Sequence, residues 1–136
     1  MGFQAGQLFI NLPVANLQRS VDFFTAIGFE FNPQFTDENA TCMIINGNTY
    51  AMLLTREYFG TFTDKTIIDS AAHTEVITCF SAASREQVDE LVQKALDAGG
   101  KPFNAPVDHG FMYNWSFQDL DGHLWEVVYM DQSAAQ

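Results

Sequence analysis

The ten residues FQDLDGHLWE, numbers 117–126, decide which fold class the sequence predicts. The Asp and Gly residues at their centre are typical of a tight turn, because Asp hydrogen-bonds nearby backbone and Gly adopts angles that other residues avoid. Residues 111–118 and 124–130 are rich in aromatic and branched side chains, which predicts two strands joined as a hairpin. The second strand carries one carboxylate, Glu126, among apolar neighbours. A buried carboxylate is costly without a partner, so we expect Glu126 either to serve a site or to be a structural acceptor bonded to its neighbours.

The second half of the sequence predicts one strand, one helix and three further strands. Residues 75–80 have the composition of a strand, and Ser84 with Gln87 forms a capping box at the start of a helix. Apolar residues then recur at helical spacing until Gly99 ends the helix. A strand is expected near 101–104, and the hairpin supplies the last two strands.

The first half of the sequence repeats this order. Asn16 caps its expected helix and Gly28 ends it. The apolar stripe of that helix is Leu17, Val21, Phe24 and Ile27. The expected strands are 7–14, 29–35, 41–46 and 50–55, with a hairpin turn at 46–48. Neither half alone could bury both its sheet and its helix.

The repeat predicts an α+β fold made of two βαβββ modules. The first module covers about 7–55 and the second about 73–131, with a connector at 56–72 that has some helix of its own. We expect the modules to pair into one cupped mixed-sheet domain with a cleft, spanning residues 1–136.

Composition limits the classes of function. The 136 residues include 47% hydrophobic residues, enough for the core of one domain. A net charge of −11 with six Lys plus Arg disfavours nucleic acid and anionic membranes, because phosphate binding needs a basic patch. No apolar run is long enough for a membrane span, and no secretory signal is expected at the N-terminus. Cys42 and Cys79 are expected to be buried, reduced thiols, so we expect a cytoplasmic protein.

Three segments carry a resemblance to a known family. They are NLPVANLQRSVDFF at 11–24, AIGF at 26–29, and the hairpin at 117–126, which has the pattern D-x-D-G-x-x-x-E. Together with the repeat, they resemble the vicinal oxygen chelate superfamily of glyoxalase I, extradiol dioxygenases, fosfomycin-resistance enzymes and bleomycin-binding proteins. Within it, the sequence looks most like small bacterial proteins labelled as predicted lactoylglutathione lyases. The resemblance implies a homodimer whose clefts are shaped by both chains.

The resemblance also implies four strand positions at which some family members bind a metal. Carried onto this sequence, these positions are Phe9, Leu53, Glu75 and Glu126. The two carboxylates could hold Mg²⁺ or Mn²⁺ weakly, whereas Phe and Leu donate no electron pair. His73, two residues before Glu75, is either a further ligand or a solvent-facing residue at the strand entry. We therefore expect no tightly bound cofactor, and at most a weakly bound divalent cation.

Alternation along residues 111–118 divides this strand into two faces. Its aromatic residues are expected to pack in the core, and its polar residues to share the face of Glu126. A register shift of one residue would exchange these faces. His109, in a loop at the strand entrance, is expected either to gate the cleft or to be solvated. The expected ligand-binding residues are Phe9, Asn11, Leu53, Asn114, Ser116, Gln118 and His109.

The sequence supports two classes of function. In the first, the chain is a small-molecule-binding protein with a degenerate metal site that sequesters an aromatic or cationic compound, as bleomycin-resistance proteins do. In the second, it is a metal-dependent lyase, isomerase or dioxygenase-like enzyme that uses Glu126 and Glu75 as metal ligands or as catalytic base. Apolar residues at two of the four metal positions favour the first class, because metal-assisted isomerisation needs an intact ligand set.

Overall fold

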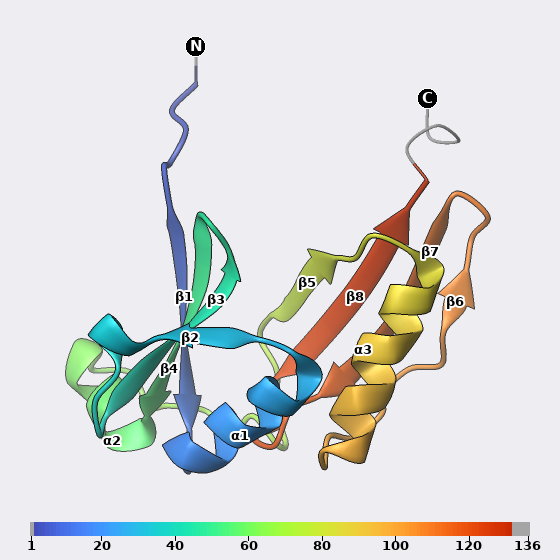
Figure 1. Ribbon diagram of the computed structural model, residues 1–136. Helices are drawn as coiled ribbons and strands as arrows, with labels where there is room; N and C mark the ends of the chain where they lie inside the picture. Colours follow the sequence, from blue (N-terminus) through green and yellow to red (C-terminus); the bar gives the residue numbers. More distant parts are fainter. Residues whose placement is uncertain (1, 132–136) are drawn as a thin grey trace. The chain divides into compact units, whose positions relative to one another are not determined.

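The computed structural model describes residues 2–131, and the chain divides into two compact units between Ile67 and Ile68 (Figure 1). Each unit contains a four-stranded sheet with both parallel and antiparallel pairs, so the predicted α+β class is confirmed. The division falls inside the expected connector. The pairing of the modules into one domain with a cleft stays a prediction. In the part of the chain that the structure describes, no helix is long and apolar enough to cross a membrane.

The first unit has the predicted order of one strand, one helix and three strands. Its elements are β1 (Leu8–Val14), α1 (Leu17–Ile27), β2 (Glu30–Asn32), η1 (Pro33–Phe35), β3 (Ala40–Asn46), β4 (Thr49–Thr55), α2 (Arg56–Phe59) and η2 (Gly60–Phe62). The sheet order is β1-β4-β3-β2, and only β1 and β4 run parallel. The strand expected at 29–35 is wrong in its second half, because Pro33 has no N–H to donate and begins a 3₁₀ turn.

Helix α1 begins and ends at the predicted residues, but its buried face is different. The Asn16 side chain accepts a hydrogen bond from the Arg19 N–H, and Gly28 has a φ of 123°. The buried residues of α1 are Ser20, Phe23, Phe24 and Ile27. Leu17 and Val21, expected in the core, are only half-buried because they lie at the edge of the face that packs on the sheet.

The second unit repeats the order of the first. Its elements are β5 (Ile77–Ser81), α3 (Arg85–Asp97), β6 (Val107–Asp108), β7 (Met112–Gln118) and β8 (Leu124–Met130), with the sheet order β5-β8-β7-β6. The strand expected at 75–80 begins two residues late, which leaves Glu75 outside it. The strand expected at 101–104 is wrong. Only Lys101 bridges to Gln118, because Pro102 cannot donate to a ladder, and the edge strand forms later as β6.

The turn between β7 and β8 is held by the buried side chain of Asp119. Its Oδ1 accepts the backbone N–H groups of Asp121 and His123, and its Oδ2 accepts the indole N–H of Trp125, each at 3.0 Å. Burial raises the pKa of this carboxyl, against the opposing effects of His123 and the donated hydrogen bonds. Gly122 has a φ of 88°, and a Cβ there would lie 2.6 Å from the carbonyl oxygen of Ser70. The prediction that this segment forms a turn is therefore confirmed. Gly122 is required both by its positive φ and by the close approach of the Ser70 backbone.

Candidate functional site

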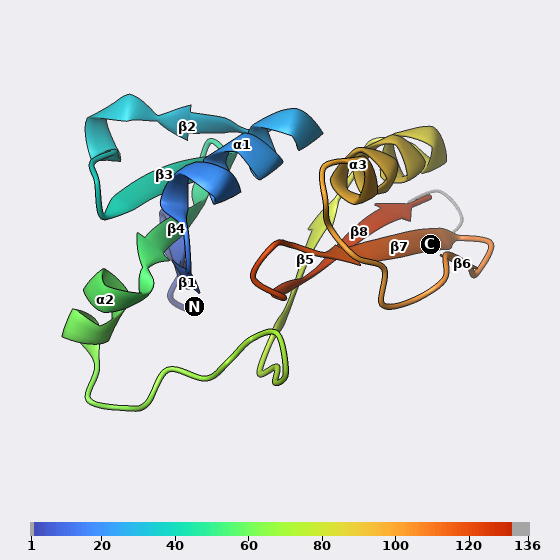
Figure 2. The ribbon, with the colours of Figure 1, turned by 90° about the horizontal axis from the view of Figure 1, so that it is seen from below.

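The sheet of the second unit has one face that α3 covers and one that it does not (Figure 2). Val92 of α3 and the strand residues Phe117 and Trp125 are fully buried, and the two rings stack with centroids 6.3 Å apart. Successive side chains of a strand point to opposite faces. Ser116 and Glu126 therefore lie on the face opposite α3, which we call the Glu126 face.

Three rows of paired residues cross the Glu126 face from β5 through β8 to β7. The rows are Ile77, Leu124 and Gln118; Cys79, Glu126 and Ser116; and Ser81, Val128 and Asn114. We call the middle one the Glu126 row. The predicted face of Asn114, Ser116 and Gln118 is confirmed, because a short regular hairpin fixed the register.

Two polar groups of the Glu126 row lack protein partners. The Ser116 side chain is 2% exposed, and its hydroxyl has no hydrogen-bond partner among residues 2–131. Glu126 is half-buried, and its carboxylate forms no hydrogen bond or ion pair within the same residues. A buried hydroxyl without a partner costs about 1–3 kcal/mol. The row therefore presents an acceptor and an unsatisfied hydroxyl to whatever occupies this face.

Cys79 differs from the buried thiol that the sequence predicts. Both cysteines are free, and Cys42 is buried as expected, but Cys79 is exposed at one end of the Glu126 row. Partial burial and, secondarily, the neighbouring Glu126 carboxylate raise the pKa of the Cys79 thiol. At neutral pH Cys79 is therefore a neutral thiol, and a weak nucleophile.

The first unit has corresponding positions with different side chains. Asn11 pairs with Met52 across parallel strands, as Cys79 pairs with Glu126. Asn11 and Cys79 each stand five residues before the residue that caps the next helix, 11 before 16 and 79 before 84. Asn11 and Met52 are therefore the counterparts of Cys79 and Glu126.

The expected placement of Leu53 beside Phe9 is wrong. Leu53 pairs with Leu12, is fully buried, and lies on the face of its sheet that contacts α1. Phe9 and Asn11 lie on the other face, where Phe9 is half-exposed and its ring stacks on Tyr50 with centroids 5.2 Å apart. In the observed register Phe9 pairs with Tyr50, three residues before Leu53, and this odd offset places Leu53 on the opposite face, in the core.

The expected partners of Glu126 from the start of the second module lie outside the row. Glu75 is exposed in a bend before β5, and the strand position beside Glu126 belongs to Cys79. His73 is also exposed, and its backbone N–H donates to the Asp69 carbonyl oxygen in a turn. Neither residue therefore stands on the strand face where the sequence placed it.

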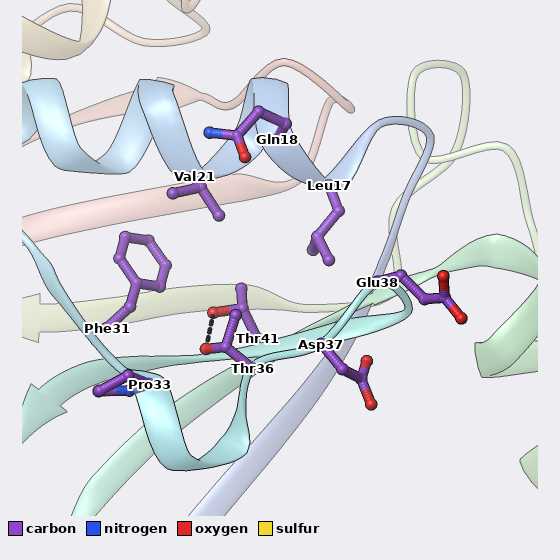
Figure 3. A pocket seen from close by; sticks show the side chains of 9 residues that line it. All are labelled: Leu17, Gln18, Val21, Phe31, Pro33, Thr36, Asp37, Glu38 and Thr41. Carbon is purple, nitrogen blue, oxygen red and sulfur yellow. Dashed lines mark hydrogen bonds between the residues drawn. The ribbon is translucent and has the colours of Figure 1, made fainter.

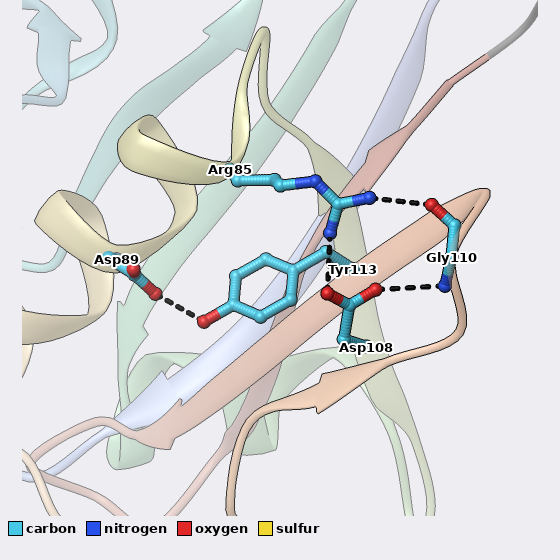
Figure 4. A network of polar contacts seen from close by, with 5 residues as sticks. All are labelled: Arg85, Asp89, Asp108, Gly110 and Tyr113. Carbon is cyan, nitrogen blue, oxygen red and sulfur yellow. Dashed lines mark hydrogen bonds and ion pairs between the residues drawn. The ribbon is translucent and has the colours of Figure 1, made fainter.

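His109 lies in a loop that a polar network ties to α3 (Figure 4). Arg85 forms an ion pair of 3.0 Å with Asp108 and donates to the Gly110 carbonyl oxygen. The Gly110 N–H and the guanidinium lower the pKa of Asp108. The network continues through Tyr113, which lies under the guanidinium. It is on the α3 side of the sheet, so it holds the loop and contributes nothing to the Glu126 face.

This network was missed from the sequence, because it joins residues far apart in the chain. Tyr113 donates its hydroxyl to Asp89 on α3, and burial together with that carboxylate raises the pKa of Tyr113 to about 12. The only local feature of the sequence that points to this network is the position of Arg85 immediately after the helix cap.

The donor set does not fit the metal site that the resemblance implies. No group of three or more His, Cys, Asp or Glu residues gathers at one place within residues 2–131. The Glu126 row offers one carboxylate and one thiol, and its counterpart in the first unit offers Asn11 and Met52. Protein metal sites ordinarily need about three protein ligands.

Two βαβββ units, the second with a carboxylate row on the face that α3 does not cover, define an α+β protein of the glyoxalase-like class. Residues 6–127 match the model of the Glyoxalase/Bleomycin resistance protein/Dioxygenase superfamily, and the chain belongs to this superfamily. The match confirms the predicted superfamily and specifies no subgroup. No curated protein matches the chain.

Several solved structures resemble the chain over nearly its whole length. A hypothetical protein from S. aureus is 28% identical, with a TM-score of 0.79 over 94% of this chain and 95% of that one. A glyoxalase-related enzyme from Fulvimarina pelagi is 17% identical, with a TM-score of 0.77 over 93% and 88%. A fosfomycin resistance protein from Listeria monocytogenes is 21% identical, with a TM-score of 0.66 over 93% and 94%. The two more distant structures support the fold alone.

Proposed function

We propose that this chain binds a small aromatic or cationic molecule on the Glu126 face. The observation that carries the proposal is the Glu126 row, in which the buried Ser116 hydroxyl and the Glu126 carboxylate have no partner among the described residues. Burying polar groups without partners lowers stability, so such groups are retained where a ligand satisfies them. The Glu126 carboxylate would accept a positively charged or N–H group of the ligand, and Ser116 would bond next to it.

Charge favours a cation as the ligand. The chain has a net charge of −11. Of the cationic side chains of the second unit, Arg85 and Lys94 belong to α3 on the opposite side of the sheet, and Lys101 bridges to Gln118 at the sheet edge. Glu126 has no ion pair with any of them. A carboxylate without a counter-ion in a strongly acidic protein attracts a cationic ligand.

Apolar side chains on both sides of the Glu126 row would contact the body of the ligand. Ile77 and Leu124 lie in the row on one side, and Val128 lies in the row on the other. Ile77, at the start of the edge strand β5, is 51% exposed and is therefore available for contact with a ligand. An apolar surface around one or two polar groups is the usual composition of a small-molecule site.

Calorimetric titration with bleomycin tests the proposal, because this compound combines a positive charge with a flat aromatic tail. Glu126→Gln is expected to weaken binding about tenfold or more, which corresponds to one lost charge-assisted hydrogen bond. Glu90→Gln, on the exposed surface of α3, removes an equal charge and is expected to bind like the wild type. Absence of binding by the wild type, or equal affinities of the two variants, would contradict the proposal.

The enzymatic alternative has less support from the geometry. A metal-dependent lyase, isomerase or dioxygenase-like reaction would need Glu75 beside Glu126, and Cys79 occupies that strand position. A weakly bound divalent cation at Glu126 stays part of the proposal, as do a homodimeric state and a cytoplasmic location. Light scattering of the purified protein tests the dimer, with a monomer mass as the contrary result.

A further inference from the structure

A cavity lies in the first unit, between α1 and the segment that includes β2 and η1 (Figure 3). Its volume is about 500 Å³, within the usual range for small-molecule sites. It uses no residue of the Glu126 row. The lining residues that carry the argument are Leu17, Val21, Phe31, Glu38 and Thr41.

One wall of the cavity is apolar. Leu17 and Val21 lie one helical turn apart on α1, and Figure 3 shows both side chains directed toward the opposite segment. Phe31 faces them from β2. Leu17 and Val21 are the two residues of the expected core stripe that the sheet leaves half-buried. The cavity therefore accounts for apolar residues at positions of α1 that the core does not use.

The floor of the cavity offers hydrogen-bond acceptors and no donor. Thr36 Oγ1 donates its only proton to the Asn32 carbonyl oxygen at 2.8 Å. Thr41 Oγ1 lies 2.9 Å from Thr36 Oγ1 and must therefore donate its own proton to that oxygen. Thr41 lines the cavity and is 1% exposed, so a hydrogen bond to its Oγ1 would be shielded from water.

Asp37 and Glu38 line the end of the cavity next to Leu17, and Figure 3 shows their carboxylate groups directed outward, at its rim. Oδ1 of Asp37 accepts backbone N–H groups in its own turn. Glu38 forms no hydrogen bond or ion pair within residues 2–131. No Lys or Arg is among the described residues that line the cavity. The cavity thus combines an apolar wall with acceptors and negative charge.

We propose that this cavity binds a small organic amine in its ammonium form, with an apolar body of about one ring. The apolar body would pack against Leu17, Val21 and Phe31. The ammonium N–H groups would bond to Thr41 Oγ1 and face the negative charge of Glu38. The proposal goes beyond the function proposed for the Glu126 face, because it assigns a second ligand site to the other unit.

Nuclear magnetic resonance titration with phenethylamine tests this site in the full chain. Amide signals of residues 17–21 and 31–41 are expected to shift in a saturable manner, and 3-phenylpropionate, of similar size but negative, is expected to shift none of them. Val21→Phe fills the cavity and is expected to abolish the shifts, with circular dichroism confirming that the variant is folded. Glu38→Gln is expected to weaken binding about two- to fivefold, as for one partly exposed ion pair.

Matched variants separate this site from the Glu126 face. Glu30→Gln removes a charge from the same unit outside the cavity and is expected to leave the phenethylamine affinity unchanged. Glu126→Gln is also expected to leave it unchanged, so failure of either proposal can be recognised independently. Equal shifts with 3-phenylpropionate, shifts that persist in Val21→Phe, or no saturable shift in the wild type would overturn the assignment.

Discussion

Replacing Asp119 by Ala tests whether one carboxylate holds the hairpin between β7 and β8. The carboxylate accepts backbone N–H groups from Asp121 and His123 and the indole N–H of Trp125. Since Trp125 is fully buried, its orphaned donor costs about 1–3 kcal/mol, and each of the two part-buried turn bonds contributes about 0.5–1.5 kcal/mol. We expect a loss of about 3 kcal/mol of unfolding free energy, or roughly 10 °C in melting temperature.

A second substitution, Asp119→Asn, separates the indole bond from the turn bonds. The amide keeps one oxygen for the backbone donors but presents an NH₂ group to the indole N–H of Trp125, so we expect a loss of about 1–2 kcal/mol. Trp125→Phe is expected to cost less in the Asp119→Ala background than in the wild type, because the two changes remove the same bond.

Guanidinium unfolding followed by circular dichroism measures these free energies. Glu90→Gln, which removes a charge from the exposed surface of α3, is the control and is expected within about 0.5 kcal/mol of the wild type. An Asp119→Ala protein as stable as this control would refute the reasoning, as would equal losses for Ala and Asn.

Three further predictions concern single groups. Iodoacetamide is expected to modify Cys79 with a rate that rises at higher pH than for a free cysteine, because burial and Glu126 raise its pKa; a profile unchanged by Glu126→Gln would contradict the role of that carboxylate. The backbone and guanidinium contacts of Asp108 lower its pKa from 3.8, so its stabilising effect is present above that value and is lost as the pH falls through the lowered pKa. Acid titration of the amide signals of 108–110 is expected to show this loss in the wild type and not in Asp108→Asn. Metal analysis after dialysis against Mn²⁺ is expected to give the same content for Glu75→Gln as for the wild type, because Glu75 lies outside β5; a fall in Mn²⁺ with that variant would instead show that Glu75 is a metal ligand.

Local signals in the sequence correctly predicted the features that depend on contacts between residues close together in the chain. Asn16 and Ser84 cap the two long helices as expected, because each side chain bonds to an N–H three residues later. The face of Ser116 was also predicted correctly, because β7 and β8 are joined by a short turn whose Asp and Gly residues fix the register. Such contacts need no information from distant parts of the chain.

The errors at the candidate site occurred where strands far apart in the sequence run parallel. Leu53 was expected beside Phe9, yet the β1–β4 register places Met52 on that face. Glu75 was expected beside Glu126, yet Cys79 stands there. A parallel pair has no turn to set its register. For Leu53 the offset is three residues, which exchanges the faces, and for Glu75 it is four residues, which leaves Glu75 before the strand begins. Counting five residues back from each helix cap would have identified the correct first-strand residues in both units.

With the observed strand registers, the central rows of the two sheets can be compared. Only the second unit has a row whose polar groups packing does not explain. In the first unit the row is Asn11, Met52 and the buried Cys42, and in the second it is Cys79, Glu126 and the buried Ser116. A thioether and a buried thiol pack as apolar groups and need no partner. A buried hydroxyl does need one, and the described residues provide none for Ser116, while the half-buried Glu126 carboxylate beside it has no protein partner either. Because both units have the same order of strands and helix, the fold does not demand polar groups at these positions. The row of the second unit is therefore the basis for the ligand site proposed above.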